Sequence, residues 1–383
     1  FKLTIRGGYN MYQNYHTDEQ FNFQINRFIE PFYENETVQA DVYAAAKQIT
    51  DVKSWISVWM ALGQKAENAK QYALSSAYYQ LADFFVGEDD PIKAQTYSLF
   101  KSNYYQSIDK SQIQFDQIPY QNGKIPVAIV RQVGATNTLI FHGGFDSYLE
   151  ELIRLVLAHC VGVLKTYNFV LFEGPGQGMA LKYGLPMTYQ WELPVKAVFD
   201  YYNIEEADLM GMSLGGYLSM RAAAFEPRIK KVIAFDVYYS MMDSLTMKLP
   251  DKAVNAVHKI NNPVIAALVN RKIMAATQND VDMAFKIQKG NEVMHTKKPS
   301  DLIKAISKFT MAGIEDKITQ DVLLLAGDHD MYVPTATVDD VAKSLINAQS
   351  VTTYLFDQAS GGERHCQVGN KQIAFDKIIH FLA

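Results

Sequence analysis

A serine flanked by glycines directly follows a short apolar segment of the chain. Residues 207–210 lead into Gly211-Met212-Ser213-Leu214-Gly215-Gly216, a G-x-S-x-G pattern at a predicted strand-to-helix junction. The turn is so tight that side chains two residues before and two after the serine would collide, and both positions are glycine. We expect Ser213 to project from the end of its strand as a nucleophile. The alternative is a glycine-rich structural turn.

A serine hydroxyl needs a neighbouring base, and one of the eight histidines is placed to supply it. His365 lies in Gly361-Gly362-Glu363-Arg364-His365-Cys366, between the last predicted strand and the final predicted helix. A loop at the carboxyl edge of a parallel sheet can reach a nucleophile on the same edge. The alternative is a surface-loop histidine. We interpret His142 as a residue that braces its own loop.

The base in turn needs an acid that fixes its tautomer and stabilises the imidazolium. Asp328 and Asp330 both follow the predicted strand 321–326, within Gly327-Asp328-His329-Asp330-Met331-Tyr332-Val333-Pro334. Asp330 matches the G-x-x-D-x-x-V-P spacing seen at this point in many hydrolases, and we favour it. Asp236, after the preceding predicted strand, is a third candidate.

Backbone N–H donors are needed where negative charge develops on a substrate oxygen. The amide of Leu214, next to the candidate nucleophile, is one expected donor. The second is expected from Phe141-His142-Gly143-Gly144-Phe145-Asp146-Ser147, a loop that follows an early strand. Glycines there let the backbone approach a substrate closely. Either Gly144 or Phe145 is the donor.

A second glycine-rich segment, Glu173-Gly174-Pro175-Gly176-Gln177-Gly178, follows the predicted strand 168–172. Turns of this kind bind the pyrophosphate of dinucleotides. Here the pattern is G-x-G-x-G instead of G-x-G-x-x-G, and Pro175 lacks an N–H donor. We therefore expect no nucleotide or other cofactor. We also expect no metal site built on cysteine, because the chain has only Cys160 and Cys366.

The elements that must position these residues follow from the hydrophobic pattern. Short apolar segments alternate with helical lengths of chain, which indicates βαβ units and a mostly parallel sheet. These segments are residues 138–141, 168–172, 207–210, 231–235, 321–326 and 351–356. Before them, residues 113–120 and 125–132 flank Asn122-Gly123, which is a strong hairpin signal. The predicted fold class is α/β.

Two stretches of the chain have helical periodicity and no strand pattern. One covers residues 11 to about 108, with Asp90-Pro91 as a predicted helix start; a tetratricopeptide-like helix pair is the alternative. The other lies between Tyr239 and Thr319. We predict an N-terminal helical domain over residues 1–110, and a second domain over 111–383 with a helical cap insertion at about 240–318. The methionine-rich insertion and the N-terminal helices are expected to enclose the site from two sides.

The composition argues against several classes of protein. The chain has 383 residues, 48% hydrophobic and 20% charged, with a net charge of −5, which is typical of a folded protein with a sizeable core. No run of Lys and Arg exceeds two residues, so neither a nucleic-acid partner nor an anionic membrane is expected. No apolar stretch reaches the ~18 residues of a membrane span.

The N-terminal FKLTIRGGYN has no apolar core of signal-peptide length. It begins with Phe1 instead of Met, which indicates a trimmed end. The two cysteines are expected to be reduced thiols, so the predicted location is cytoplasmic.

Five motifs, read in order, resemble one branch of the α/β-hydrolase superfamily: HGGFDS, FEGPGQG, GMSLGG, GDHDMYVP and GERHC, behind a helical N-terminal region. This branch contains 2,6-dihydroxypseudooxynicotine hydrolase, the FrsA-like esterases and bacterial proteins labelled acylaminoacyl-peptidase-like. The resemblance covers nearly the whole chain and implies the α/β-hydrolase fold. It also implies site roles: Ser213 as nucleophile, Asp330 as acid, His365 as base, Gly144, Phe145 and Leu214 around the oxyanion, and Asp146 touching substrate or orienting its loop.

The residues and the resemblance together predict a cofactor-independent serine hydrolase of a small acyl compound with an ester, amide or acylaminoacyl bond. One alternative is a C–C bond hydrolase of the dihydroxypseudooxynicotine hydrolase type. Another is a non-catalytic binding protein on the same fold, although no member of the triad is missing. The expected partner is a small acyl substrate, and a homodimer is the one assembly left open.

Overall fold

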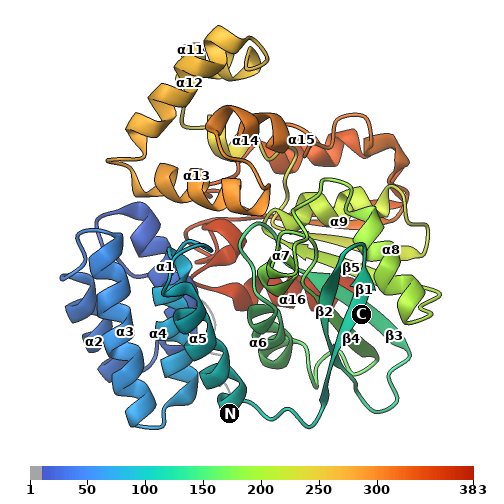
Figure 1. The fold of residues 1–383 in the computed structure, drawn as a ribbon. Helices are drawn as coiled ribbons and strands as arrows, with labels where there is room; N and C mark the ends of the chain where they lie inside the picture. The colour runs from blue at the N-terminus through green and yellow to red at the C-terminus, as the bar shows by residue number, and fades with distance from the viewer. Residues whose placement is uncertain (1–10) are drawn as a thin grey trace.

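A computed structural model describes residues 11–383 and contains an eight-stranded sheet with helices on both faces (Figure 1). The expectations about the chain's first ten residues lie outside the described part. The strands are β1 (Ile113–Tyr120), β2 (Gly123–Val130), β3 (Asn137–His142), β4 (Tyr167–Phe172), β5 (Ala207–Met212), β6 (Ile229–Phe235), β7 (Asp321–Gly327) and β8 (Ser350–Phe356). Their order across the sheet is β1-β2-β4-β3-β5-β6-β7-β8.

The strands from β3 to β8 pair in parallel, while β1 and β2 form an antiparallel hairpin that joins the sheet through β4. The predicted α/β fold class is therefore confirmed, as is the hairpin around Asn122-Gly123. β3 lies between β4 and β5, and His142 at its end is opposite Gly211. The loops that follow β3 and β5 consequently leave the same edge of the sheet beside each other.

Helices cover both faces of the sheet, so the parallel strands from β3 to β7 are buried on both sides, whereas the edge strand β8 stays largely exposed. α8 (Glu192–Tyr201), α9 (Gly215–Ala223) and α15 (Thr337–Ser344) contribute to the core on one face. α6 (Leu149–His159) and α16 (Lys371–Leu382) contribute to the core on the other face, together with α5 (Lys93–Ser107) from the N-terminal region. This burial explains why the strands read as continuous apolar segments in the sequence.

The N-terminal region consists of α1 (Glu19–Ile29), η1 (Glu30–Phe32), α2 (Glu36–Ala46), α3 (Val52–Asn68), α4 (Tyr72–Phe84) and α5. Its aromatic side chains pack on one another, with Phe21 stacked on Trp55 at 4.9 Å between ring centroids. The predicted helix start at Asp90-Pro91 was wrong, because α5 begins at Lys93. Asp90 instead closes a turn, in which its side chain accepts a hydrogen bond from Ile92 N.

A helical insertion connects β6 to β7 (Figure 1, yellow to orange). It contains α10 (Asp243–Thr246), α11 (Asp251–His258), α12 (Pro263–Ala276), α13 (Val281–Val293), α14 (Pro299–Ile306) and η2 (Glu315–Lys317). A β-bridge between Ser240 and Thr310 joins its two ends. α13 packs against the end of α4, where Phe285 stacks on Phe84 at 4.7 Å. The division of the chain into domains at residue 110 and a cap at about 240–318 remains a prediction. No helix of the described chain is long and apolar enough to cross a membrane.

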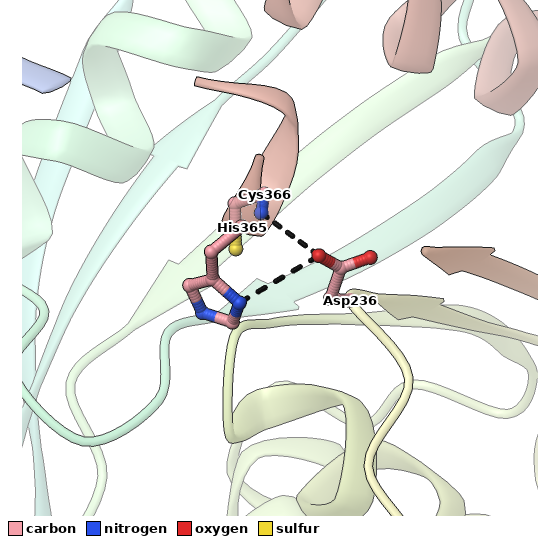
Figure 2. A group of neighbouring side chains, drawn as sticks. All are labelled: Asp236, His365 and Cys366. Atoms are coloured by element: carbon pink, nitrogen blue, oxygen red, sulfur yellow. Dashed lines mark hydrogen bonds and ion pairs between the residues drawn. The ribbon is translucent and has the colours of Figure 1, made fainter. Parts of the chain in front are cut away.

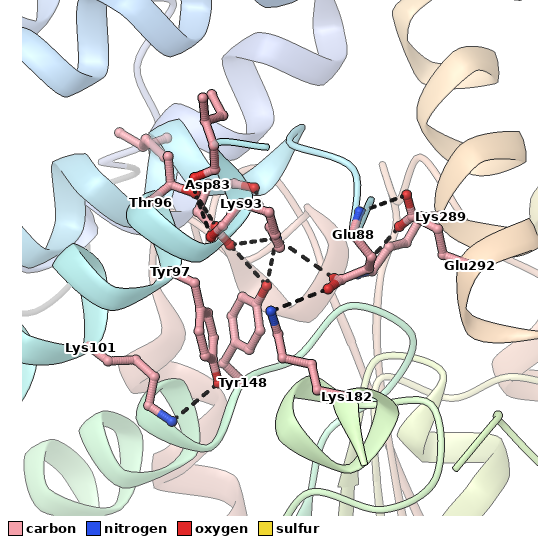
Figure 3. Close-up of polar contacts among 12 residues, drawn as sticks. Asp83, Glu88, Lys93, Thr96, Tyr97, Lys101, Tyr148, Lys182, Lys289 and Glu292 are labelled. Carbon is pink, nitrogen blue, oxygen red and sulfur yellow. Dashed lines mark hydrogen bonds and ion pairs between the residues drawn. The ribbon is translucent and has the colours of Figure 1, made fainter. Parts of the chain in front are cut away.

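A buried cluster of charges connects the N-terminal region, the sheet region and the insertion (Figure 3). Lys93 Nζ lies 2.8 Å from Asp83 Oδ2 and donates to Tyr148 Oη at 3.1 Å. The carboxylate of Glu88 forms ion pairs with Lys289 Nζ of α13, at 3.0 Å, and with Lys182 Nζ of α7 (Gly178–Lys182), at 3.5 Å. Because these charged side chains are shielded from water, each one is stabilised mainly by its oppositely charged partners.

Removing Lys93 should therefore destabilise the protein far more than removing an exposed lysine. The Lys93 side chain is 3% exposed and that of Asp83 is 0% exposed. We expect Lys93→Met to lower the free energy of unfolding by about 3–5 kcal/mol, because it leaves an unpaired buried carboxylate. Urea denaturation measures this. The control is Lys65→Met, which breaks the solvent-exposed pair with Asp41 and should cost at most about 1 kcal/mol. Equal losses for the two variants would contradict the account.

Candidate active site

Ser213 lies at the tight turn between β5 and α9. Its φ angle is +63°, a left-handed conformation that a non-glycine residue seldom adopts. A Cβ atom at Gly211 would overlap the carbonyl oxygen of Gly215, and one at Gly215 would lie only 2.7 Å from the carbonyl oxygen of Gly143. Glycine is therefore required on both sides of the serine for a steric reason.

The structure brings Ser213, His365 and Asp330 together from three loops at the carboxyl edge of the sheet. Ser213 Oγ lies 2.8 Å from His365 Nε2, and His365 Nδ1 lies 2.6 Å from Asp330 Oδ2. His365 begins the short helix η3 (His365–Gln367), after β8. The other oxygen of Asp330 accepts hydrogen bonds from the amides of Tyr332 and Val333. This carboxylate is thereby held with one oxygen facing the imidazole.

Opposing effects act on the pKa of His365. Burial lowers this pKa, and the neighbouring Asp330 carboxylate raises it; the net result lies well above the ordinary histidine value. The imidazolium form is therefore stabilised by the pair, as is needed of a base that holds a proton temporarily.

The other two candidate acids are placed differently. Asp236 Oδ2 is 3.6 Å from His365 Nδ1 and accepts a hydrogen bond from Cys366 N at 2.8 Å (Figure 2). Burial, followed by repulsion from Asp330, raises the pKa of Asp236 well above its ordinary value. Asp328 instead contacts the exposed His329 at 2.6 Å. Of the three acids, Asp330 alone is within hydrogen-bond distance of the His365 ring.

Asp236, His365 and Cys366 are also the described residues that come nearest to a metal-binding group, with their ligand atoms within 4.8 Å of one another. The group does not fit a metal ion. Both ring nitrogens of His365 are already hydrogen-bonded. Burial raises the pKa of Cys366, which disfavours the thiolate that a metal requires.

The loop after β3 approaches the serine turn closely. A Cβ atom at Gly144 would lie 2.7 Å from Leu214 N, so no side chain fits there. The amide of Gly144 is already used, because it donates to Ser147 Oγ at 3.1 Å. Within residues 11–383, the amides of Phe145 and Leu214 have no hydrogen-bond acceptor. Of the two amides that the sequence left open, that of Phe145 is the one available.

The segment Glu173-Gly174-Pro175-Gly176-Gln177-Gly178 braces this loop. Gln177 Nε2 donates to the carbonyl oxygens of Gly143 and Gly144, and the carboxylate of Glu173 accepts from Leu149 N and Met179 N. Burial raises the pKa of Glu173 to about 7. The sequence did not reveal this role, because a glycine-rich turn after a strand resembles a phosphate-binding turn. A polar glutamine within a glycine-rich turn after a buried strand was the one available signal.

Three comparisons place the chain among known proteins. No family model matches it. The chain is 25% identical over 405 residues to 20-hydroxy-prefusarin hydrolase FUS2 of Gibberella moniliformis, covering 94% of this chain and 95% of the relative. It is 29% identical over 279 residues to the alpha/beta hydrolase psoB of Aspergillus fumigatus, covering 61% of this chain and 62% of the relative. The chain is an α/β-hydrolase enzyme.

Its fold is also similar to the crystal structure of 2,6-dihydroxy-pseudo-oxynicotine hydrolase. The TM-score is 0.64 at 19% sequence identity, over 90% of this chain and 93% of that one. The likeness extends over the N-terminal helices and the insertion as well as the sheet, because it covers most of both chains.

The pocket of this α/β-hydrolase contains Ser213 and is mostly apolar. Phe145, Leu214, Tyr238 and Tyr332 surround the serine, and the insertion supplies Met241, Ser244, Leu245, Phe285, Lys286, Ile287, Gly290, Leu302 and Ile306. The charged residues in the lining are paired: Asp146 with Arg27 at 3.2 Å, and Lys286 with Asp282 at 2.6 Å. The inserted helices thus roof the pocket, and its charges are neutralised.

Met241 is the one methionine among the lining residues of the insertion, and Met274 is exposed on its surface. One detail of the predicted enclosure was wrong. No lining residue comes from the described N-terminal helices. α1 instead lies behind the site: Gln20 accepts a hydrogen bond from Tyr332 Oη at 2.7 Å, and the ring of Phe23 lies 6.4 Å from that of His365. The N-terminal helices support the site and do not form its wall.

His142 is a neutral, buried bracing residue, with Nδ1 2.9 Å from Gly143 O. Burial lowers its pKa from 6.5 to about 4. Because the folded state resists protonation of this ring, the protein should lose stability as the pH falls from 6.5 to 4, by about 3 kcal/mol. We expect the His142→Gln variant not to show this part of the loss of stability between pH 6.5 and pH 4. Unfolding free energies of both proteins between pH 7 and pH 4 test it, and parallel curves would refute it.

Proposed function

We propose that this α/β-hydrolase is a serine hydrolase with Ser213 as nucleophile, His365 as general base and Asp330 as the orienting acid. The observation that carries the proposal is the unbroken hydrogen-bond chain from Ser213 Oγ through the imidazole to Asp330 Oδ2, at 2.8 and 2.6 Å. A serine hydroxyl becomes an effective nucleophile when a base accepts its proton as it attacks. Asp330 selects the tautomer that leaves Nε2 free to accept this proton.

The reaction follows from these positions. Ser213 Oγ attacks the substrate carbonyl carbon, and its proton moves to His365 Nε2. The carbonyl oxygen becomes an oxyanion, which receives hydrogen bonds from the amides of Leu214 and Phe145. His365 then donates the proton to the leaving group, which leaves an acyl group on Ser213. Water, activated by the same histidine, hydrolyses that acyl-enzyme.

The lining supports a small, largely apolar and uncharged acyl substrate. The two charged lining residues already have partners, so an ionic substrate group would have to displace Arg27 or Asp282. We assign Asp146 the role of orienting its loop through Arg27. One relative is named as a hydrolase of 20-hydroxy-prefusarin, and the apolar pocket of this chain suits a small organic compound. An ester, amide or acylaminoacyl bond is compatible with this mechanism. Both cysteines are buried free thiols, which supports a cytoplasmic setting.

Ser213 should be the serine that reacts stoichiometrically with a fluorophosphonate, because it has both a base and an oxyanion site. We expect Ser213→Ala to abolish labelling and to lower the hydrolysis of short-chain aryl esters by about 10⁴-fold or more. Intact-mass spectrometry measures labelling, and a p-nitrophenyl ester series measures turnover. Labelling of Ser213→Ala at the wild-type level would overturn the assignment. Casein should not be degraded, since the roofed pocket excludes a long polypeptide.

Asp330 and Asp328 provide a matched pair of variants. We expect Asp330→Asn to lower kcat by about 10⁴-fold and Asp328→Asn to behave as wild type. His365 accepts a proton only when it is neutral, so activity rises with pH through its raised pKa. Removing the Asp330 charge should lower the pKa of His365, so the rise in activity should occur at lower pH in Asp330→Asn than in the wild type. Rate profiles of kcat/KM from pH 5 to 10 test this. A crippled Asp328→Asn would contradict the assignment, and wild-type rates in both variants would direct attention to Asp236.

A further inference from the structure

The side chain of Gln177 is 1% exposed and makes hydrogen bonds to the backbone of two loops. Its Nε2 donates to Gly143 O and to Gly144 O, each at 2.8 Å, and its Oε1 accepts from Gly174 N at 2.8 Å. Both donor hydrogens of the amide are used, and the carbonyl end is held by its own turn. The side chain is therefore fixed in orientation and connects the turn after β4 to the loop after β3.

One of these bonds determines where the amide of Phe145 points. The Gly144 carbonyl and the Phe145 N–H belong to one planar trans peptide unit, so they point in opposite directions. Gln177 holds the carbonyl on its own side, which turns the N–H away from Gln177. Phe145, Ser213 and Leu214 all line the pocket. A carbonyl that accepts a hydrogen bond also polarises its peptide, which strengthens the N–H as a donor.

The second bond acts on the preceding peptide. The Gly143 carbonyl accepts from Gln177, while the N–H of the same peptide, on Gly144, donates to Ser147 Oγ at 3.1 Å. This peptide is held at both ends, and its N–H is occupied within the loop. Two successive N–H groups beside Gln177 therefore differ. The N–H of Gly144 is hydrogen-bonded within its own loop, and the N–H of Phe145 is left without an acceptor in the described chain.

We propose that Gln177 is a positioning residue that aims the Phe145 N–H at the oxyanion formed on the substrate. The proposal rests on the serine-hydrolase function proposed above. Gln177 touches neither the substrate nor Ser213; it acts through the Gly144–Phe145 peptide. A neutral amide suits the task, because a side chain facing two carbonyl oxygens must donate twice and carry no negative charge.

Two variants remove the donors while keeping the size of the side chain. Gln177→Glu places a carboxylate against two carbonyl oxygens, and Gln177→Met keeps the length with no N–H. We expect either to lower kcat for a p-nitrophenyl ester by about 10²-fold, which is the effect of losing one oxyanion donor. KM should change less than about threefold, because the donor acts on the transition state. If the buried charge prevents Gln177→Glu from folding, Gln177→Met decides the question.

The matched control is Gln320→Glu, at another buried glutamine. Gln320 Nε2 donates to Ala223 O at 2.9 Å, beside the N-terminal end of β7 and thus at the opposite edge of the sheet. Its kcat should equal that of the wild type. Thermal unfolding of every variant shows whether a lower rate reflects a loss of folded enzyme.

A transition-state analogue separates positioning from a general structural role. An aryl trifluoromethyl ketone forms a tetrahedral adduct with an oxyanion, and its Ki should rise in proportion to the fall in kcat/KM in both Gln177 variants. Affinity for the corresponding aryl methyl ketone, which stays mostly planar, should not change. Wild-type kcat in the folded variants, or equal loss of affinity for both ketones, would overturn the proposal. An unlabelled wild-type Ser213 would instead defeat the serine-hydrolase function itself, so the two failures are distinguishable.

Discussion

The parallel pairing of β3 with β5 is the constraint on which the whole site depends. It places His142 opposite Gly211, so the loop after one strand and the turn after the other leave the sheet as neighbours. Gly144 then approaches the amide of Leu214 so closely that no side chain could fit between them. The next strands pair in the same direction, and their loops deliver Asp330 and His365 to the same edge. This series of parallel pairings, which begins with β3 and β5, therefore brings together groups that lie more than 200 residues apart in the chain.

The N-terminal helices contribute by supporting the loop after β3 with buried polar contacts. Arg27 of α1 contacts both Asp146 and Glu151, Tyr148 Oη donates to Asp83 at 2.9 Å, and Glu150 accepts from Tyr105 Oη at 2.7 Å. Enclosed ion pairs add little net stability, but losing one partner is costly. Their effect here is to limit the conformations of the loop that carries the amides of Gly144 and Phe145. The lysines around Glu88 extend the same network to α13 of the insertion, which roofs the pocket.

Two carboxyl groups near one imidazole have separate tasks because their environments differ. Asp330 receives two backbone amides on one oxygen and faces His365 with the other. Asp236 is fully enclosed beside that negative charge, so its pKa is raised, and it accepts a hydrogen bond from Cys366 N. Like charges at such a distance do not both ionise readily in a buried site. The arrangement separates a carboxylate that faces the His365 ring from one that holds the loop carrying His365.

The sequence by itself determined the features that depend on local physics. Apolar segments of strand length predicted every strand, and the glycines around Ser213 predicted the tight turn, because steric limits and burial patterns act on neighbouring residues. Its spacing favoured Asp330 over Asp328 but left Asp236 open, and it left Gly144 and Phe145 as equal candidates. Only the tertiary structure shows which carboxylate lies within hydrogen-bond distance of His365, which of the two amides already has an acceptor, how Gln177 braces the loop, and that α1 lies behind the site. Each of these features depends on hydrogen bonds between polar groups that are far apart in the sequence. Such hydrogen bonds produce no periodic pattern in the sequence from which they could be predicted.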